Sequence, residues 1–209
     1  MEAEAATDSN SIASDEETDR RPSLNTLALM RKATTPANIS SIAIKDWRSV
    51  IYKGVLWKNN TQFWVDEKLH KNCFLVLPKA CDIDRSKKGS CLIIKLKKLS
   101  WLLIEGRFKT RTLSPYTTYE VAFVVKLIGT DYEWQYPVEL ELCQPNGTKQ
   151  IRTEYLKPKP EEEWINLRAG EFMMAPWTAG TIYFALHETF DPRKSGLIFR
   201  GVLIHPKKD

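Results

Sequence analysis

The side chains that most often carry out chemistry are scattered along this sequence. No two of its four cysteines form a C-x-x-C pair, and its three histidines are widely separated: Cys73, Cys81, Cys91 and Cys143, with His70, His187 and His205. Zinc sites and redox dithiols depend on closely spaced ligands, so the sequence predicts no metal and no other cofactor. The thiols are expected to be buried or half-buried in a reducing compartment. An exposed one could crosslink chains under oxidising conditions.

The carboxylates indicate binding rather than catalysis. The acidic run at residues 161–163 is typical of a solvated surface. Glu171 and Glu188 could be paired as acid and base, but any β-protein of this size offers such pairs. An active site needs a nucleophile with its base, a paired acid and base, or a metal. The sequence has no serine or cysteine motif with a suitable partner and no glycine-rich phosphate loop. We therefore expect a binding module and not an enzyme.

Charge and hydropathy divide the chain into an acidic N-terminal part and a basic body. Residues 1–45 have few large apolar side chains and contain five Lys or Arg against seven Asp or Glu, which predicts a disordered tail. Within it, residues 24–32 show a helical pattern too short to be stable alone. Residues 46–209 carry 26 basic against 19 acidic side chains, a net charge of +7, and are long enough for one domain with a single core.

The same features indicate which compartment and which partners to expect. The chain has no apolar run as long as a membrane span, and its acidic N-terminus lacks the layout of a secretory signal. We therefore expect a cytoplasmic or nucleocytoplasmic protein with no membrane partner. The basic body could attract RNA or acidic proteins, although charges spread along strands are more typical of solvated strand faces.

Hydrophobic periodicity predicts many short β-strands in the body. Apolar residues take alternate positions in residues 102–108 and again in 119–127, and Pro115 interrupts the pattern between them. We interpret these two stretches as adjacent antiparallel strands at the centre of a sandwich. An opening segment is predicted at residues 54–66 with a turn at residues 59–60, and further strands at residues 72–77, 91–99, 138–143, 151–155, 164–172, 182–188 and 197–204. Since almost no helix is expected, the fold class is all-β, a jelly-roll-type sandwich.

Five segments resemble the plant phloem protein 2 (phloem lectin) family, which includes the Nictaba-like lectins. They are FWVDEKLHKNCFLVL, LSWLLIEGRF, LSPYTTYEVAFVVKL, EEWINLRAGEF and KSGLIFRGVLIHPK, and they follow the family order over roughly residues 52–207. The resemblance implies a jelly-roll sandwich without a metal that binds N-acetylglucosamine oligomers or N-glycan cores. It also implies a nucleocytoplasmic or phloem-sap protein, with homodimers common among members.

The resemblance further implies a sugar site made of two tryptophans and an acid. The C–H face of a pyranose lies on an indole ring, and its hydroxyls need carboxylate or amide partners. One alignment places the tryptophan pair at Trp57 and Trp64. A second alignment, which has the longer match, places this platform at residues 82–92, where the first tryptophan has become Arg85 and the second falls near Leu92.

The acid of this site is the same in both alignments. It is Glu171, in the G-E-F segment, while a second acid of some members falls near Thr178. Losing aromatic faces from a shallow site removes on the order of 1–3 kcal/mol each, which is enough to alter or abolish weak sugar binding. We therefore expect a lectin-like phloem protein with an eroded aromatic platform. The alternative is a non-lectin interaction protein that binds RNA or other phloem proteins through its basic body.

Overall fold

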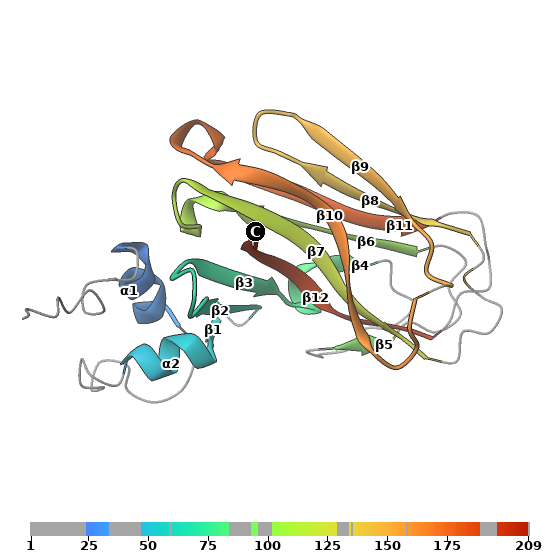
Figure 1. Cartoon of the computed structure of the whole chain (residues 1–209), viewed down its shortest axis with the longest axis horizontal. Coiled ribbons are helices and arrows are strands. Elements are labelled where there is room, and N and C mark those ends of the chain that lie inside the picture. Colours follow the sequence, from blue (N-terminus) through green and yellow to red (C-terminus); the bar gives the residue numbers. More distant parts are fainter. Residues whose placement is uncertain are drawn as a thin grey trace, which may run out of the picture.

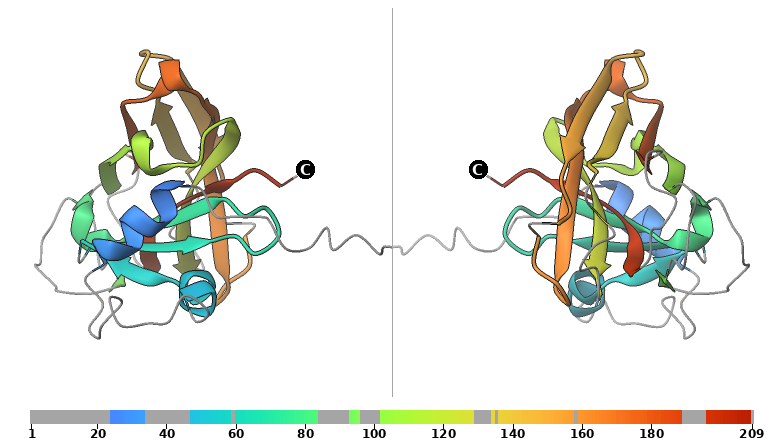
Figure 2. Two further views of the ribbon diagram at one scale, coloured as in Figure 1. Left: turned by 90° about the vertical axis from the view of Figure 1, so that its left-hand side faces the viewer. Right: turned by 90° about the vertical axis from the view of Figure 1, so that its right-hand side faces the viewer.

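The computed structural model describes residues 24–33, 47–58, 60–83, 93–95, 102–128, 134, 136–157, 159–188 and 196–208. Within these residues, two antiparallel β-sheets pack face to face, and two short helices lie together at one end of them (Figures 1 and 2). The helices are α1 (Leu24–Arg31) and α2 (Trp47–Lys53). The all-β, jelly-roll-type sandwich predicted from the sequence is confirmed.

Each sheet mixes strands from distant parts of the chain. The seven-stranded sheet has the order β1-β2-β3-β12-β7-β10, with β5 also paired to β12. Its strands are β1 (Val55–Trp57), β2 (Thr61–Val65), β3 (Asn72–Val76), β5 (Ile94–Lys95), β7 (Thr117–Leu127), β10 (Trp164–Met174) and β12 (Leu197–Pro206). The five-stranded sheet has the order β4-β6-β11-β8-β9. Its strands are β4 (Asp82–Ile83), β6 (Leu102–Lys109), β8 (Val138–Cys143), β9 (Lys149–Glu154) and β11 (Thr181–Glu188).

Three single 3₁₀ turns complete the described secondary structure: η2 (Pro78–Ala80), η3 (Thr110–Thr112) and η4 (Pro176–Thr178). The predicted strands agree with the observed ones to within about two residues at each end wherever the structure describes them, but β4 was not predicted, because its residues begin a charged segment that was interpreted as a loop. For the strand predicted at residues 91–99 only residues 93–95 are described, and the rest lies outside the described residues. No helix in the described part of the chain is long and apolar enough to cross a membrane.

One predicted pairing is wrong. From β6 onward the chain changes sheets at every connection except the β8–β9 hairpin, so β6 and β7 lie in opposite sheets. β6 pairs with β4 and β11, whereas β7 pairs with β10 and β12. η3 and Pro115 lie in the connection that carries the chain across the sandwich. Strands that face each other across a core alternate in burial just as paired strands do, so periodicity could not separate the two arrangements.

Aromatic side chains join the two sheets across the core. Phe74 of β3 packs against Phe108 of β6 with ring centroids 5.0 Å apart, and Phe123 of β7 meets Phe184 of β11 edge to face at 6.0 Å. All four rings are buried, and aromatic pairs at these separations add to the stabilisation from burial alone. The sandwich is therefore a rigid support for the outward-facing side chains of both sheets.

The predicted disordered tail is contradicted over residues 24–33. These residues form α1 and the turn after it, and Leu29 and Met30 are buried in the main core. The helix is too short to be stable alone, so its stability comes from this packing, which the local pattern of the sequence does not reveal. The other residues of the predicted tail lie outside the described residues, and the domain boundary stays a prediction.

Candidate functional site

Glu171, the predicted site residue on which both alignments agree, lines a hollow at one end of the seven-stranded sheet. The hollow has a volume of about 420 Å³ and is formed by the turn between β2 and β3 and by the ends of β7, β10 and β12. Its lining residues are Leu69, Lys71, Tyr116, Thr117, Thr118, Glu171, Pro206 and Lys207. Three neighbouring strands therefore contribute side chains to one surface depression.

A β-bulge in β10 places Glu171 on the outer face. Arg168 pairs with Ala122 and Gly170 with Val121, so Ala169 is an extra residue without its own partner. In a regular strand, residues three apart point to opposite faces. The bulge adds one residue to the count, and Arg168 and Glu171 consequently share the outer face of the sheet.

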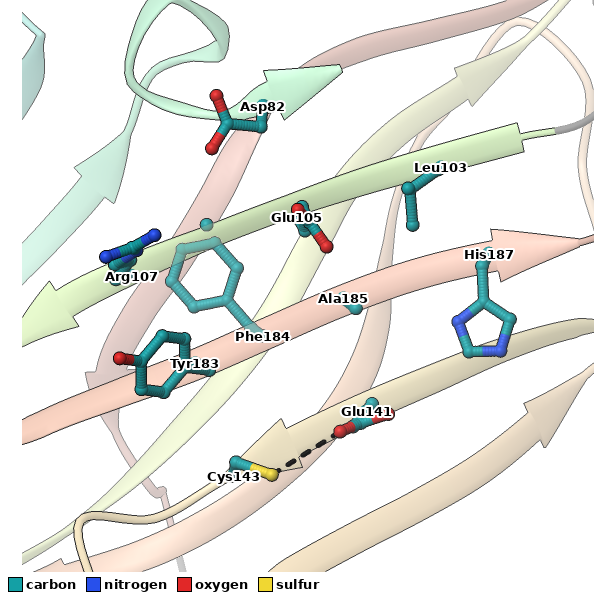
Figure 3. A pocket seen from close by; sticks show the side chains of 11 residues that line it. Asp82, Leu103, Glu105, Arg107, Glu141, Cys143, Tyr183, Phe184, Ala185 and His187 are labelled. Carbon is teal, nitrogen blue, oxygen red and sulfur yellow. Dashed lines mark hydrogen bonds between the residues drawn. The ribbon is translucent and has the colours of Figure 1, made fainter. Parts of the chain in front are cut away.

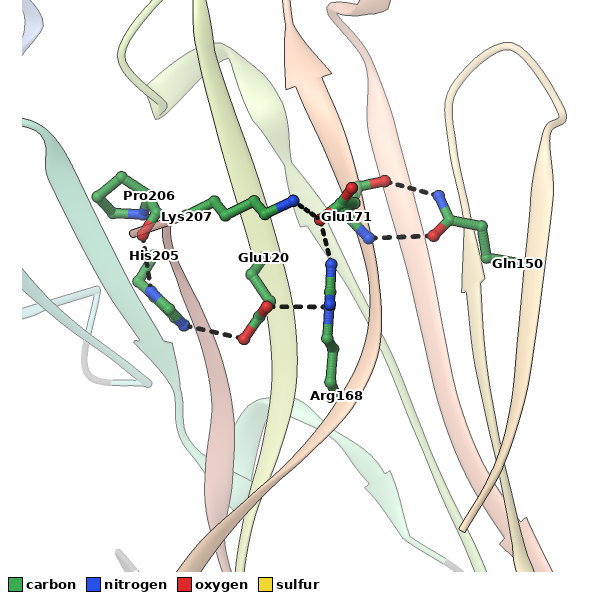
Figure 4. A network of polar contacts seen from close by, with 7 residues as sticks. All are labelled: Glu120, Gln150, Arg168, Glu171, His205, Pro206 and Lys207. Carbon is green, nitrogen blue, oxygen red and sulfur yellow. Dashed lines mark hydrogen bonds and ion pairs between the residues drawn. The ribbon is translucent and has the colours of Figure 1, made fainter. Parts of the chain in front are cut away.

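The carboxylate of Glu171 is held by two cations. Lys207 Nζ lies 3.0 Å from Glu171 Oε2, and the Arg168 guanidinium donates to the same oxygen (Figure 4). Hydrogen bonding to Lys207, with the charge of Arg168, holds the pKa of Glu171 below its ordinary value. The group is thus an ionised acceptor with a fixed direction.

The network continues across the sheet and restrains Arg168. Glu120 of β7 is the register partner of Glu171, and its Oε2 lies 2.9 Å from Arg168 Nε. His205 Nε2 of β12 lies 3.5 Å from Glu120 Oε1 (Figure 4). Because Arg168 contacts both carboxylates, it keeps Glu120 and Glu171 side by side without net repulsion.

A side chain from the other sheet fixes the backbone of Glu171. The backbone N–H of Glu171 donates to Gln150 Oε1 at 3.1 Å, and Gln150 Nε2 donates to the backbone carbonyl of Glu171 at 2.6 Å (Figure 4). β10 is an edge strand, and edge strands expose backbone groups that invite unwanted pairing. Gln150 of β9 satisfies these groups and locks the position of Glu171.

Tyr116 provides an aromatic wall that sequence reasoning missed. Its side chain is 72% exposed, and its φ of 51° places it in the left-handed region directly after Pro115. Its backbone N–H donates to the carbonyl of Met174 at 2.7 Å, which ties it to β10. The related signal in the sequence was the strand break L-S-P-Y, which predicts a turn but not the direction of the tyrosine ring.

The two tryptophans of the first alignment lie away from Glu171. Trp57 is 8% exposed and packs in the core against Phe74, with ring centroids 6.0 Å apart. An indole so deeply buried has no free face for a pyranose, so this burial contradicts a platform role for Trp57. Trp64 is half-buried and packs against a small apolar cluster that contains Leu75 and Val124. Neither indole lines the Glu171 hollow.

The other predicted contacts are also separate from the hollow or outside the described residues. Arg85 and Leu92 lie outside them. Thr178 is 9% exposed, and its hydroxyl accepts from the N–H of Ala175 at 2.7 Å, so it shapes η4 rather than facing the hollow. Glu188 is buried on β11 of the other sheet, and it does not pair with Glu171.

The hollow presents groups that can bind a polar ligand. It offers an oriented carboxylate, an ammonium, two threonine hydroxyls and a phenol ring, which together can accept and donate hydrogen bonds around a flat ring. Among the described residues, no group of three or more His, Cys, Asp or Glu could hold a metal ion. The arrangement suits a polar ligand with an apolar face.

Known proteins are similar to this sequence over most of its length. The model of the phloem protein 2 family matches residues 55–206. The chain is 34% identical over 203 residues to "Protein PHLOEM PROTEIN 2-LIKE A1" of Arabidopsis thaliana, covering 88% of this chain and 81% of the relative. It is 30% identical over 170 residues to a protein named "Lectin" from Luffa acutangula, covering 74% of this chain and 81% of that protein.

One solved structure adds little to this comparison. A xylan-binding domain from Paenibacillus barcinonensis aligns with 62% of this chain and 81% of that domain, at 15% identity and a TM-score of 0.33. A TM-score this low is too weak to argue from. The match of the family model over residues 55–206 and the two relatives are sufficient: the chain belongs to the phloem protein 2 family.

Proposed function

We propose that this chain is a lectin-like, non-enzymatic protein that binds N-acetylglucosamine oligomers or N-glycan cores in the Glu171 hollow. The observation that carries the proposal is an ionised, cation-held carboxylate beside a 72% exposed tyrosine ring, at Glu171 and Tyr116. Two relatives named "Lectin", from Luffa acutangula and Coccinia grandis, support the same class of ligand.

Each part of an N-acetylated sugar has a complementary group in the hollow. The apolar face of a pyranose would lie on Tyr116, and its hydroxyls would donate to Glu171 and accept from Lys207. The methyl of the acetamide would contact Leu69, which is 39% exposed. Hydrogen bonds to charged groups contribute about 1.5–3 kcal/mol each, so Glu171 is the dominant anchor in this arrangement.

The proposed site is weaker than one with two stacked indoles. Tyr116 is one ring, and Trp57 and Trp64 do not line the hollow. Arg85 is retained as a proposed contact, at the position where the resemblance expects the first tryptophan. We therefore propose an affinity near the weak end for lectins, and phloem sap, suggested by the names of the relatives, as the compartment in which the protein works.

The proposal is tested by calorimetric titration of the full chain with chitotriose, backed by a glycan array. We expect saturable heat with wild-type protein and a loss of about 1.5–3 kcal/mol of binding free energy in Glu171→Ala. Tyr116→Ala should cost about 1–3 kcal/mol. Glu163→Ala, an exposed carboxylate outside the hollow, is the matched control and should bind like wild type. Absence of both heat and array binding at high protein concentration would sink the proposal.

A further inference from the structure

A second hollow lies on the opposite outer face of the sandwich, over the five-stranded sheet. Its volume is about 430 Å³, and strands β4, β6, β8 and β11 form it (Figure 3). The side chains that line it on the outer face are Asp82, Leu103, Glu105, Arg107, Glu141, Cys143, Tyr183, Ala185 and His187. No residue of this surface belongs to the Glu171 hollow, so any function it has is separate.

Ala185, a small residue between the rings of Tyr183 and His187, makes the floor of this second hollow. Tyr183, Ala185 and His187 follow at every second position of β11 and share its outer face, while Phe184 points into the core. Figure 3 shows the two rings on either side of the short Ala185 side chain. Tyr183 is 50% exposed. A flat ligand can therefore lie over the small Ala185 side chain and pack against the Tyr183 ring.

The rings are held in place by charged neighbours. The guanidinium of Arg107 lies 5.5 Å from the centroid of the Tyr183 ring, within the range of a cation–π contact. His187 Nε2 lies 3.3 Å from Glu139 Oε1. Two side chains with fixed orientations lose less entropy when a ligand is bound.

Carboxylates face the floor from both sides. Ala185 is the register partner of Glu105 on β6 and of Glu141 on β8, so the two acids flank it. Glu141 is engaged by Lys149, with Nζ and Oε2 2.8 Å apart. Asp82 of β4 is in turn the register partner of Glu105.

Asp82 and Glu105 are two acidic residues at paired positions of neighbouring strands, and no described residue neutralises either carboxylate. Within the described residues neither side-chain carboxylate makes a hydrogen bond or an ion pair, although both backbones take part in the sheet ladder. Like charges directly opposite on neighbouring strands repel each other and destabilise a sheet. A cation placed between the two carboxylates would remove that repulsion. It would lie at the edge of the hollow, beside Ala185.

We propose that this outer hollow is a second carbohydrate-binding site, selective for amino sugars whose amine is not acetylated. One sugar ring rests on Ala185 against Tyr183, its hydroxyls donate to Glu141, and its ammonium lies between Asp82 and Glu105. Acidic sugars are excluded because three carboxylates and one guanidinium line the surface. The proposal goes beyond the Glu171 hollow, and it does not depend on sugar binding there.

The test is a calorimetric titration of the full chain with a glucosamine trimer at mildly acidic pH, where its amines are charged. We expect saturable binding, with affinity about tenfold weaker or worse in Glu105→Gln, since one charge-assisted contact is lost. Ala185→Ile, which fills the floor with a residue suited to a strand, should remove measurable binding. A galacturonic acid trimer should give no heat.

Controls separate this site from general charge effects and from the other hollow. Glu163→Gln makes the same charge change outside the hollow and should keep wild-type affinity, and unfolding midpoints should show that every variant folds. No binding of the glucosamine trimer, equal affinity in Ala185→Ile, or preference for the acidic trimer would each overturn the proposal. Binding of the glucosamine trimer without binding of chitotriose would refute the proposed function and uphold this site.

Discussion

The hydroxyl of Thr26 in α1 donates a 2.9 Å hydrogen bond to Oδ1 of Asn72 in β3, and both side chains are fully buried. Asn72 Nδ2 donates to the carbonyl of Thr112 at 3.0 Å, and its backbone N–H donates to Ser114 Oγ at 3.0 Å. The hydroxyl of Tyr119 donates to the carbonyl of Asn72 at 2.9 Å. This polar network fastens the helix to the connection between β6 and β7, beside the Glu171 hollow.

Removal of the Thr26 hydroxyl tests whether this attachment stabilises the body. Thr26→Val keeps the shape but leaves a buried amide oxygen of Asn72 without that donor, which costs about 1–3 kcal/mol. We expect a lower free energy of unfolding in urea with an unchanged denaturant slope. Thr153→Val, at an exposed position of β9, is the control. Stability within about 0.5 kcal/mol of wild type, as for ordinary surface changes, would show that the bond contributes nothing.

The ionisation of Glu171 should respond to Lys207. Because Lys207 lowers the pKa of Glu171 in the folded protein, the ion pair stabilises the fold above the unfolded-state pKa. This stabilisation is lost as the pH falls through the lowered folded-state pKa. Lys207→Met should raise the pKa of Glu171 toward its ordinary value, as followed by NMR titration of the side-chain carboxyl. Lys208→Met is the matched control, and an unshifted titration in Lys207→Met would contradict the pairing.

Gly201 is expected to be the less replaceable of two glycines with positive φ. Its φ is 147°, and an added Cβ would lie 2.5 Å from the carbonyl oxygen of Val76. Gly147, in the β8–β9 turn, has a φ of 85° and no heavy atom within 4 Å of such a Cβ. Gly201→Ala combines backbone strain with a clash and should cost about 3 kcal/mol or more. Gly147→Ala carries only the strain of about 1–2 kcal/mol, and equal midpoints in thermal unfolding would refute the distinction.

The thiols should differ in reactivity. Burial raises the pKa of Cys73 and of Cys81 to about 12, so neither should react with a thiol reagent in the native protein at mildly alkaline pH. Desolvation and Glu141 also raise the pKa of Cys143, which is less buried. In a Cys91→Ser background we expect slow labelling at Cys143 only, located by peptide mass mapping.

Glu141→Gln provides the internal check on these thiols. It removes the negative charge that opposes formation of the Cys143 thiolate and replaces the carboxylate acceptor with a weaker amide oxygen, so the labelling rate should increase. Labelling of Cys73 or Cys81 without denaturant would contradict their burial. A slower rate at Cys143 in Glu141→Gln would contradict the role of the carboxylate.

Period-two alternation predicted strands such as β6 and β8, because each buries one face whichever sheet contains it, whereas β3 is buried on both faces and was predicted from its apolar run. It could not assign β6 and β7 to opposite sheets, since partner choice depends on strands far away in sequence. The same reason explains α1: Leu29 and Met30 are buried in a core made of side chains that are remote in the sequence. Short local patterns predict burial but do not show what the buried side chains contact.

The candidate site was predictable in part. Glu171 followed from the resemblance, and the structure places it in a hollow with Lys207. Tyr116 was not predicted, because an exposed aromatic residue after a proline has no periodic signature. The outer hollow at Ala185 depends on cross-strand register, which brings Glu105 and Glu141 to either side of one alanine. No spacing in the sequence encodes that arrangement.

The crossings between the sheets also affect how quickly the strand pairings form during folding. β7 lies beside the edge strand β10 and pairs with β10 and β12, and β12 separates β7 from β3. Contacts between segments so remote in the chain are slow to form, because long loops must close before the contacts compensate for the lost entropy. A nascent or truncated chain without β12 would expose two unpaired strand borders, at β3 and at β7. Such a species is a template for aggregation, so the integrity of the seven-stranded sheet depends on β12.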